Sequence, residues 1–154
     1  IYLVVEEEQL NKEFIYFAHV IDGVVASRRN KGSYLDNGVF KIEKYFNTLR
    51  LSRINTSFTL NKDTALSKSS GANISDSVLS SLPIKATNKE ETSFLVNVTS
   101  LFLSEELTPI KPVSRPSGDE DSFRWGQISS TKSKIERILN YPENECNRIM
   151  IQLV

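Results

Sequence analysis

The chain has 154 residues, of which 39% are hydrophobic and 25% charged, and its 19 basic and 19 acidic residues cancel. A chain of this length buries roughly 70% of the surface that its unfolded form exposes, so residues 1–154 are expected to fold as a single domain with a real core. The balanced charge removes the electrostatic basis for binding nucleic acid or anionic lipid, and no apolar run approaches the roughly 18 residues of a membrane helix.

Both ends of the chain have the sequence of β-strands. It opens with Ile1-Tyr2-Leu3-Val4-Val5 and closes with Arg148-Ile149-Met150-Ile151-Gln152-Leu153-Val154. Domains usually end in polar, frayed residues. An apolar C-terminal segment, in a chain that begins without Met, therefore predicts a fragment of a longer protein whose domain is incomplete at the C-terminus.

Two strand patterns of different kinds follow. Residues 13–21 are apolar at both alternating sets of positions, which predicts a strand covered on both faces at the centre of a sheet. Residues 38–46 alternate and predict a half-buried strand: Phe40, Ile42 and Phe46 lie on the inner face, and Lys44 is the one charged exception there.

The next segments complete the sheet. After Asn47-Thr48, residues 49–54 resume the period of two, which predicts a hairpin with residues 38–46. Residues 94–99 and 147–154 predict further strands.

Two short helices are expected beside these strands. One begins at Asn73, a capping residue, and ends before Pro83, with Ile74, Val78, Leu79 and Leu82 on one face. The other covers residues 133–139, where Ser133 and Glu136 have the spacing of a capping box. Residues 67–71 and 108–118 predict exposed loops. The expected fold is therefore β-rich, possibly α+β: an antiparallel sheet carrying one or two short helices on a face.

The residues of catalytic or metal-binding type are few. His19 is the only histidine and Cys146 the only cysteine, so neither a His-rich zinc site nor a disulfide within the chain can form. His19 lies in the strand expected to be buried, which favours a core histidine bound to backbone over a ligand or general base. Glu6-Glu7-Glu8 and Asp119-Glu120-Asp121 lack the spacing of a calcium loop, and are interpreted as a solvated strand end and a solubilising loop.

Contact positions for a partner are the other candidates. Arg28 and Arg29 belong to the densest basic cluster, and Arg50 with Arg53 forms a second. Phe123, Arg124 and Trp125 combine residue types that anchor interfaces, although the same residues can fold back onto the core. Three sequences fit the N-glycosylation acceptor pattern, at Asn55, Asn73 and Asn97, and glycines nowhere have the spacing of a phosphate-binding loop.

Several segments, read in order, resemble one family. They are Glu13-Phe14-Ile15-Tyr16-Phe17, Leu35-Asp36-Asn37-Gly38-Val39-Phe40-Lys41-Ile42-Glu43, Asp76-Ser77-Val78-Leu79-Ser80-Ser81-Leu82-Pro83-Ile84, Leu95-Val96-Asn97-Val98-Thr99-Ser100-Leu101-Phe102, Lys132-Ser133-Lys134-Ile135 and Asn140-Tyr141-Pro142-Glu143-Asn144. The likeness is to the uncharacterised domain that precedes the catalytic domain in bacterial zinc-dependent metalloproteases of the met-zincin type.

The resemblance implies a non-catalytic accessory domain of an exported protease, whether periplasmic, on the cell surface or extracellular. Zinc would be held by a His-Glu-x-x-His motif in the catalytic domain, outside this sequence, and no cofactor is expected in the fragment itself. The implied partners are that catalytic domain, within the same protein, and a protein or peptide substrate. Arg28, Arg29, Phe123, Arg124 and Trp125 are the contact positions to test.

Two rival interpretations are weighed against the accessory domain. The first is a free-standing secreted recognition module of β-sandwich type that binds glycan or protein through aromatic and polar loop residues. The second, an independent hydrolase, is disfavoured, because a nucleophile beside a buried-strand histidine would have poor geometry.

Overall fold

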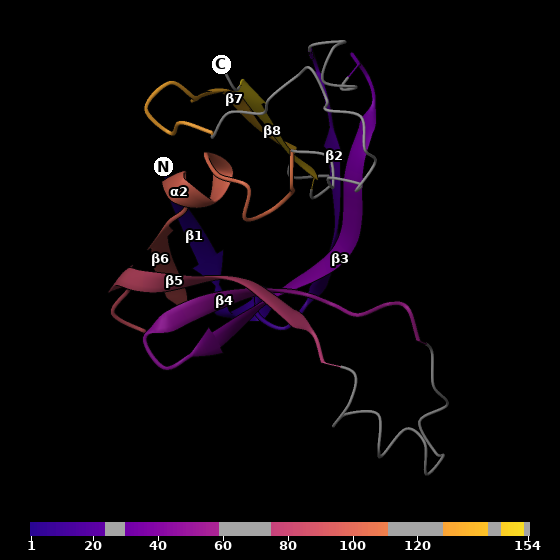
Figure 1. The fold of residues 1–154 in the computed structure, drawn as a ribbon. Coiled ribbons are helices and arrows are strands. Elements are labelled where there is room, and N and C mark those ends of the chain that lie inside the picture. The colour runs from indigo at the N-terminus through magenta and orange to yellow at the C-terminus, as the bar shows by residue number, and fades with distance from the viewer. Residues whose placement is uncertain (24–29, 59–74, 111–127, 142–145, 153–154) are drawn as a thin grey trace. The chain divides into compact units, whose positions relative to one another are not determined.

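The computed structural model describes residues 1–23, 30–58, 75–110, 128–141 and 146–152 (Figure 1). Six strands form one antiparallel sheet of order β1-β6-β5-β4-β3-β2, and two form the pair β7-β8. The predicted β-rich fold is confirmed. The elements are β1 (Tyr2–Glu6), a 3₁₀ helix η1 (Glu7–Gln9), β2 (Glu13–His19), β3 (Tyr34–Tyr45), β4 (Thr48–Arg53), β5 (Ser77–Thr87), β6 (Ser93–Asn97), α2 (Thr99–Phe102), β7 (Lys134–Tyr141) and β8 (Cys146–Gln152).

The chain divides into two compact units. Unit 1 comprises Ile1–Phe17 and Asp36–Val98, and unit 2 comprises Ala18–Leu35 and Thr99–Val154. Strands β2 and β3 each contribute residues to both units. That the whole chain is one domain stays a prediction.

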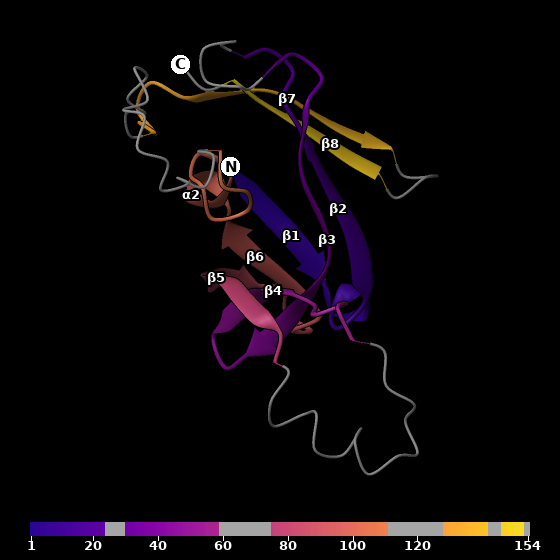
Figure 2. The ribbon, with the colours of Figure 1, turned by 45° about the vertical axis from the view of Figure 1, so that its right-hand side comes forward.

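The six-stranded sheet is curled, as Figure 2 shows. Its two edge strands, β1 and β2, are consecutive in the chain and joined by residues 7–12, in which Glu7 N–H donates to Thr92 O and Asn11 N–H to Ile42 O. The edges of a flat six-stranded sheet would be about 24 Å apart, from five spacings of about 4.8 Å. A connection that contains a 3₁₀ turn, rising about 2 Å per residue, is shorter than this, so the sheet must bend.

The core of unit 1 lies against the inner side of this sheet. Val5 and Phe94 face each other across the β1–β6 pair, and Phe40 on β3 is only 1% exposed. Lys44, the charged exception predicted on the inner face, has its Nζ 4.4 Å from the centroid of the Phe94 ring, so the ring stabilises the charge. The buried apolar side chains of unit 1 are Val5, Phe40, Leu49, Leu51, Ile84, Phe94, Val96 and Val98.

The predicted hairpin is confirmed as β3–β4. Its register runs from Tyr45↔Thr48 at the tip to Phe40↔Arg53 at the base, and the turn is Phe46-Asn47. Phe46, predicted on the inner face of the strand, is instead in this turn and exposed. The alternation of apolar and polar residues over 38–46 therefore continues one residue past the end of β3, because apolar character alone does not show where a strand ends.

The helix predicted from Asn73 to Pro83 is wrong where the structure describes it, because Ser77–Thr87 form strand β5. The first part of β5 pairs with β4 as far as Thr48↔Pro83, and the rest pairs with β6 from Ile84↔Val96. Pro83 has no N–H to donate and stands where the strand changes partner, a position that tolerates it. The register shifts between Leu51 and Ser52 against this strand. A bulge adds one residue to a strand, so that apolar residues three positions apart can lie on one face of the strand. The same spacing places residues on one face of a helix, and the pattern therefore does not distinguish the two.

The position predicted for residues 13–21 is also wrong. They do form a strand, β2, but it lies at the edge of the sheet rather than at its centre. His19 is exposed rather than in the core, and its ring meets that of Tyr34 edge to face with centroids 5.8 Å apart. Apolar residues on both alternating faces favour a strand at the centre of a sheet, but they do not determine its place in the sheet.

Unit 2 contains the β7–β8 hairpin and the helix α2. The helix predicted over residues 133–139 is wrong, because Lys134–Tyr141 pair with β8 from Lys134↔Gln152 to Tyr141↔Cys146. Here too a register shift, between Ile135 and Arg137, disturbs the period of two. Ser133 does not cap a helix: its hydroxyl donates to Ser129 O at 2.8 Å. Thr108, placed at the start of an exposed loop, is buried.

Candidate interaction surface

One face of strand β2 contacts the core residue Phe40, although no residue of the strand is itself buried, and the other face is in solvent. On the inner side, the rings of Phe14 and Tyr16 lie 6.0 and 5.0 Å from that of Phe40, measured between centroids. On the other side, Ile15 is 71% exposed and Phe17 60% exposed. Large apolar side chains in a row on an exposed strand are typical of a surface that another protein or domain covers.

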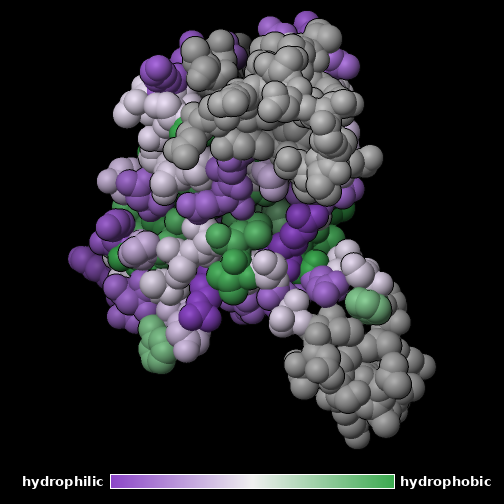
Figure 3. All heavy atoms as spheres, in the orientation of Figure 1, coloured by the Kyte–Doolittle hydropathy of each residue, from purple (hydrophilic) through white to green (hydrophobic). Residues whose placement is uncertain are grey.

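The opposite edge strand, β1, is similar. Tyr2 and Val4 are more than half exposed, although both belong to a strand made almost entirely of apolar residues. In the described sheet β1 pairs with β6 alone. Figure 3 shows that hydrophobic side chains also reach the surface among hydrophilic ones on the face drawn there.

The tip of the β3–β4 hairpin carries a third group, in which Tyr45 and Phe46 are exposed and Arg50 is half-buried. Tyr45, Phe46 and Arg50, here named the aromatic tip, lie in a row: the rings of Tyr45 and Phe46 meet edge to face with centroids 4.7 Å apart, and the Arg50 guanidinium carbon lies 3.6 Å from the centroid of the Tyr45 ring. Phe46 is 83% exposed. The guanidinium and the two rings therefore form one ordered patch.

The backbone under the aromatic tip is strained at Phe46. Its φ is +51°, in the left-handed region, which costs an L-residue roughly 1–2 kcal/mol and favours glycine. The turn is nevertheless firmly held. Thr48 Oγ1 donates to Tyr45 O at 2.8 Å, and Ile84 N–H on β5 donates to Asn47 O at 3.0 Å.

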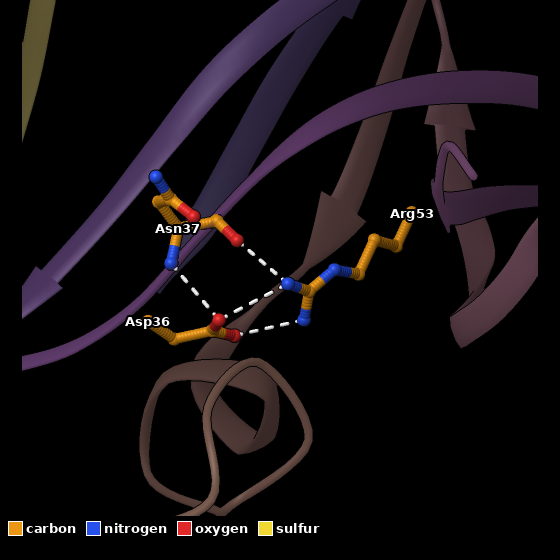
Figure 4. A network of polar contacts seen from close by, with 3 residues as sticks. All are labelled: Asp36, Asn37 and Arg53. Atoms are coloured by element: carbon orange, nitrogen blue, oxygen red, sulfur yellow. Dashed lines mark hydrogen bonds and ion pairs between the residues drawn. The ribbon is translucent and has the colours of Figure 1, made fainter. Parts of the chain in front are cut away.

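The base of the same hairpin is held by an ion pair. Arg53 donates two hydrogen bonds to the carboxylate of Asp36, at 2.8 and 3.0 Å, and a third to Asn37 O at 2.6 Å (Figure 4). The space over Gly38 is needed for this side chain, because a Cβ there would lie 3.1 Å from Arg53 Nε and 3.3 Å from the Phe40 ring. Gly38 thus allows the guanidinium to lie across the backbone beside the core.

A second polar cluster joins β3 to the start of β5. Lys41 Nζ lies 2.9 Å from Asp76 and 3.2 Å from Glu43, whose carboxylate also accepts from the Ser52 hydroxyl. The hydrogen bond between Lys41 and Asp76 raises the pKa of Lys41 and lowers the pKa of Asp76. Asn55 N–H also donates to Asp76 and lowers the pKa of Asp76 further. Both groups stay charged near neutral pH.

These clusters are suited to holding strands together. The carboxylates of Asp36, Glu43 and Asp76 already face cations, which leaves no member of either cluster poised as a base. Throughout the described ranges, no three His, Cys, Asp or Glu residues come together as a metal site. The clusters therefore fix the hairpin and the start of β5.

A comparison with protein families matches residues 32–151 to the family Domain of unknown function (DUF5117). The chain belongs to this family. Neither the curated proteins nor the solved structures include a significant match. The matched residues of this DUF5117 domain include the aromatic tip and both polar clusters, whereas β1 and β2 precede them.

The contact positions predicted from the sequence lie outside the described residues. They are Arg28, Arg29, Phe123, Arg124 and Trp125, and Asp119-Glu120-Asp121 and Asn73 lie outside as well. Arg50 and Arg53, predicted to form a second basic cluster, contact different residues. Arg53 binds Asp36 at the base of the hairpin, and Arg50 lies on the Tyr45 ring near the tip. Glu6 ends β1, and its carboxylate accepts from the Ser93 hydroxyl at 2.5 Å, while Glu7 begins η1.

Sequence reasoning missed the aromatic tip of this DUF5117 domain. One signal was available: Asn47 is a turn residue, and two residues between paired strands form the commonest hairpin turn, which places Phe46 in the turn rather than in the strand. In the parts of the chain that the structure describes, no helix has the length and apolar character needed to cross a bilayer.

Proposed function

We propose that this DUF5117 domain is a non-catalytic accessory domain of an exported zinc-dependent metalloprotease. It would pack against a catalytic domain encoded outside this sequence and help to shape access to that domain. The proposal rests on the resemblance of residues 13–17, 35–43, 76–84, 95–102, 132–135 and 140–144 to the domain that precedes such catalytic domains. The family match supports the existence of a domain and adds no activity to it.

The observation that carries the proposal is the mismatch between the sequence of β2 and its surroundings. The strand has the composition of one covered on both faces, yet Ile15 and Phe17 are exposed. A neighbouring domain that covers this face would bury both side chains, at about 25 cal/mol per Å² of apolar surface. Such a contact suits two domains of one protein, because linkage raises their effective concentration.

Under this proposal the zinc belongs to the catalytic domain. The residues of this chain would contact that domain and, through the cleft they help to shape, a protein or peptide substrate. Zinc would lower the pKa of a bound water there, and a glutamate of the binding motif would take its proton. The parent protein would act in the periplasm, at the cell surface or outside the cell.

The full coding sequence is the first test. The proposal expects a His-Glu-x-x-His motif and a further His downstream of residue 154, and it expects the purified full-length protein to contain zinc and to lose proteolysis of casein when treated with a chelator. A Glu→Gln change in the motif should abolish cleavage and leave the zinc bound. A reading frame that ends soon after residue 154 would overturn the proposal in favour of a free-standing recognition module.

The contact itself can be tested in the same protein. A photo-crosslinking amino acid at position 15 should link β2 to peptides of the catalytic domain, because Ile15 faces outward from the sheet. The matched control is position 90, an exposed site in the turn between β5 and β6. Equal crosslinking from the two positions would count against packing through β2.

A further inference from the structure

The aromatic tip differs from the other exposed apolar groups in shape and in charge. We propose that it is an anchor that inserts into an apolar recess of the catalytic domain, with a carboxylate of that domain at the rim to receive Arg50. This inference rests on the proposed function and names a second contact surface for the same partner.

The apolar part of the anchor is Phe46. A single exposed phenylalanine is common on protein surfaces, but this one lies at the end of a narrow two-residue turn and in a backbone conformation that favours glycine. A turn that needs only to close a hairpin has no requirement for a bulky residue there. A convex, rigid aromatic group fits a concave site, and aromatic residues in such sites dominate binding energy at interfaces.

The charge of the anchor comes from Arg50. Two other cations of the hairpin, Lys41 and Arg53, lie 2.9 and 2.8 Å from carboxylates. Arg50 instead lies on the Tyr45 ring, and no carboxylate in the described portion of the chain forms an ion pair with it. A partner that supplied one would gain a charge-assisted, bidentate contact. An acidic rim around an apolar recess is therefore the complementary surface.

The anchor is also ordered before it binds. Arg50 holds one side of the Tyr45 ring and Phe46 meets it edge to face, while Thr48 and Ile84 bind the turn. Side chains that are fixed in advance lose little conformational entropy on association. Phe46 stands in the turn, and Tyr45 and Arg50 stand in the paired strands beside it, so the patch is held by the sheet and presents its aromatic rings to solvent.

Photo-crosslinking in the full-length protein tests the anchor. Benzoylphenylalanine at position 46 should crosslink to peptides of the catalytic domain, whereas the same group at position 58, where Phe58 is also exposed but lies in a segment without regular structure, should not. Arg50→Gln should lower the yield from position 46 about tenfold, the loss expected when an interface hot spot is removed, a class of residues in which arginine is enriched. Lys85→Gln, which removes an exposed charge from β5, should leave it unchanged.

Two results would overturn the anchor. One is a yield from position 46 no greater than that from position 58, and the other is a yield that Arg50→Gln leaves unchanged while circular dichroism shows both variants folded. These results are distinct from failure of the proposed function. If the reading frame contains the zinc motif and position 15 crosslinks to the catalytic domain while position 46 does not, the accessory role stands and the anchor alone is wrong.

Discussion

The two ends of the β3–β4 hairpin differ in how their charged and aromatic side chains are placed. At the base, Arg53 is neutralised by Asp36, Gly38 leaves the space that the guanidinium needs, and the Phe40 ring beside them is buried. At the tip, Phe46 is exposed in a strained conformation and Arg50 lies on an aromatic ring rather than on a carboxylate. The base therefore stabilises the fold, whereas at the tip the backbone conformation of Phe46 costs stability.

That difference makes the tip, rather than the base, the place to look for a role other than folding. Local choices in a protein usually agree with its fold, and positions that break local rules without a compensating gain in stability tend to be functional. The same criterion separates the two faces of β2, one packed on Phe40 and the other exposed. Changes at the base should therefore alter stability and changes at the tip should alter binding.

The largest effect on stability is expected at the base. Phe40→Ala removes a ring that is 1% exposed and in contact with Phe14 and Tyr16, so the free energy of unfolding should fall by about 3–5 kcal/mol. Urea titration followed by circular dichroism measures this. Phe58→Ala, at an exposed position, should change the value by less than about 0.5 kcal/mol. Similar losses for both would contradict the assignment of Phe40 to the core.

The strands at this base were predictable because their sequence has a clean period of two. Phe40 and Ile42 alternate with Lys41 and Glu43, and the pattern resumes after the turn, so the hairpin follows from local sequence alone. Strands β5 and β7 were not predictable in this way. A bulge in the pairing of each breaks the alternation, and the resulting spacing imitates a helix.

The candidate surface was less predictable than the fold. The sequence of β2 indicates a strand covered on both faces, and no local pattern could show that the described chain covers only one. The pairing of Arg53 with Asp36 joins residues far apart in sequence, so it depends on the register of the hairpin. The five contact positions predicted first, Arg28, Arg29, Phe123, Arg124 and Trp125, stay untested predictions.

A smaller effect is expected from Gly38→Ala. The added Cβ would lie 3.1 Å from Arg53 Nε and 3.3 Å from the buried Phe40 ring, so the variant should lose about 1–3 kcal/mol of unfolding free energy. Because Arg53 supplies one of the two close contacts, Arg53→Ala should cost less in the Gly38→Ala background than in the wild type. A double-mutant cycle measures this coupling, expected at about 0.5 kcal/mol or more. Strict additivity would show that the two residues do not compete for the same space.

At the tip, two substitutions of one residue separate backbone strain from side-chain contact. Phe46→Gly and Phe46→Ala both remove the ring from Tyr45, but only glycine adopts a φ of +51° without steric cost. The glycine variant should therefore be the more stable of the two by about 1 kcal/mol, which is visible as a higher midpoint of thermal unfolding. An alanine variant equal to or more stable than glycine would show that the turn is not strained at this position.

The smallest effect concerns Lys41 and Asp76, and its dependence on pH has a defined sign. The pKa of Asp76 is lowered in the folded state, below its ordinary 3.8, chiefly by the hydrogen bond from Lys41, so its contribution is present above pH 3.8 and is lost as the pH falls through the folded value. The pKa of Lys41 is raised above its ordinary 10.5, chiefly by the same bond, so its contribution is present below pH 10.5 and is lost as the pH rises through the folded value.

Asp76→Asn should therefore cost less than about 1 kcal/mol across neutral pH, because the pair is partly exposed and screened by salt. The difference in stability between the wild type and Asp76→Asn should shrink below about pH 4. In that range the Asp76 carboxylate of the unfolded wild-type chain takes up a proton, which favours the unfolded state until the folded protein is protonated as well. Glu90→Gln, which neutralises an exposed carboxylate in the turn before β6, is the matched control for a change of charge alone. A difference between wild type and Asp76→Asn that stays constant from pH 7 to pH 3 would contradict this assignment, because it would show that the charge of the Asp76 carboxylate contributes nothing to stability.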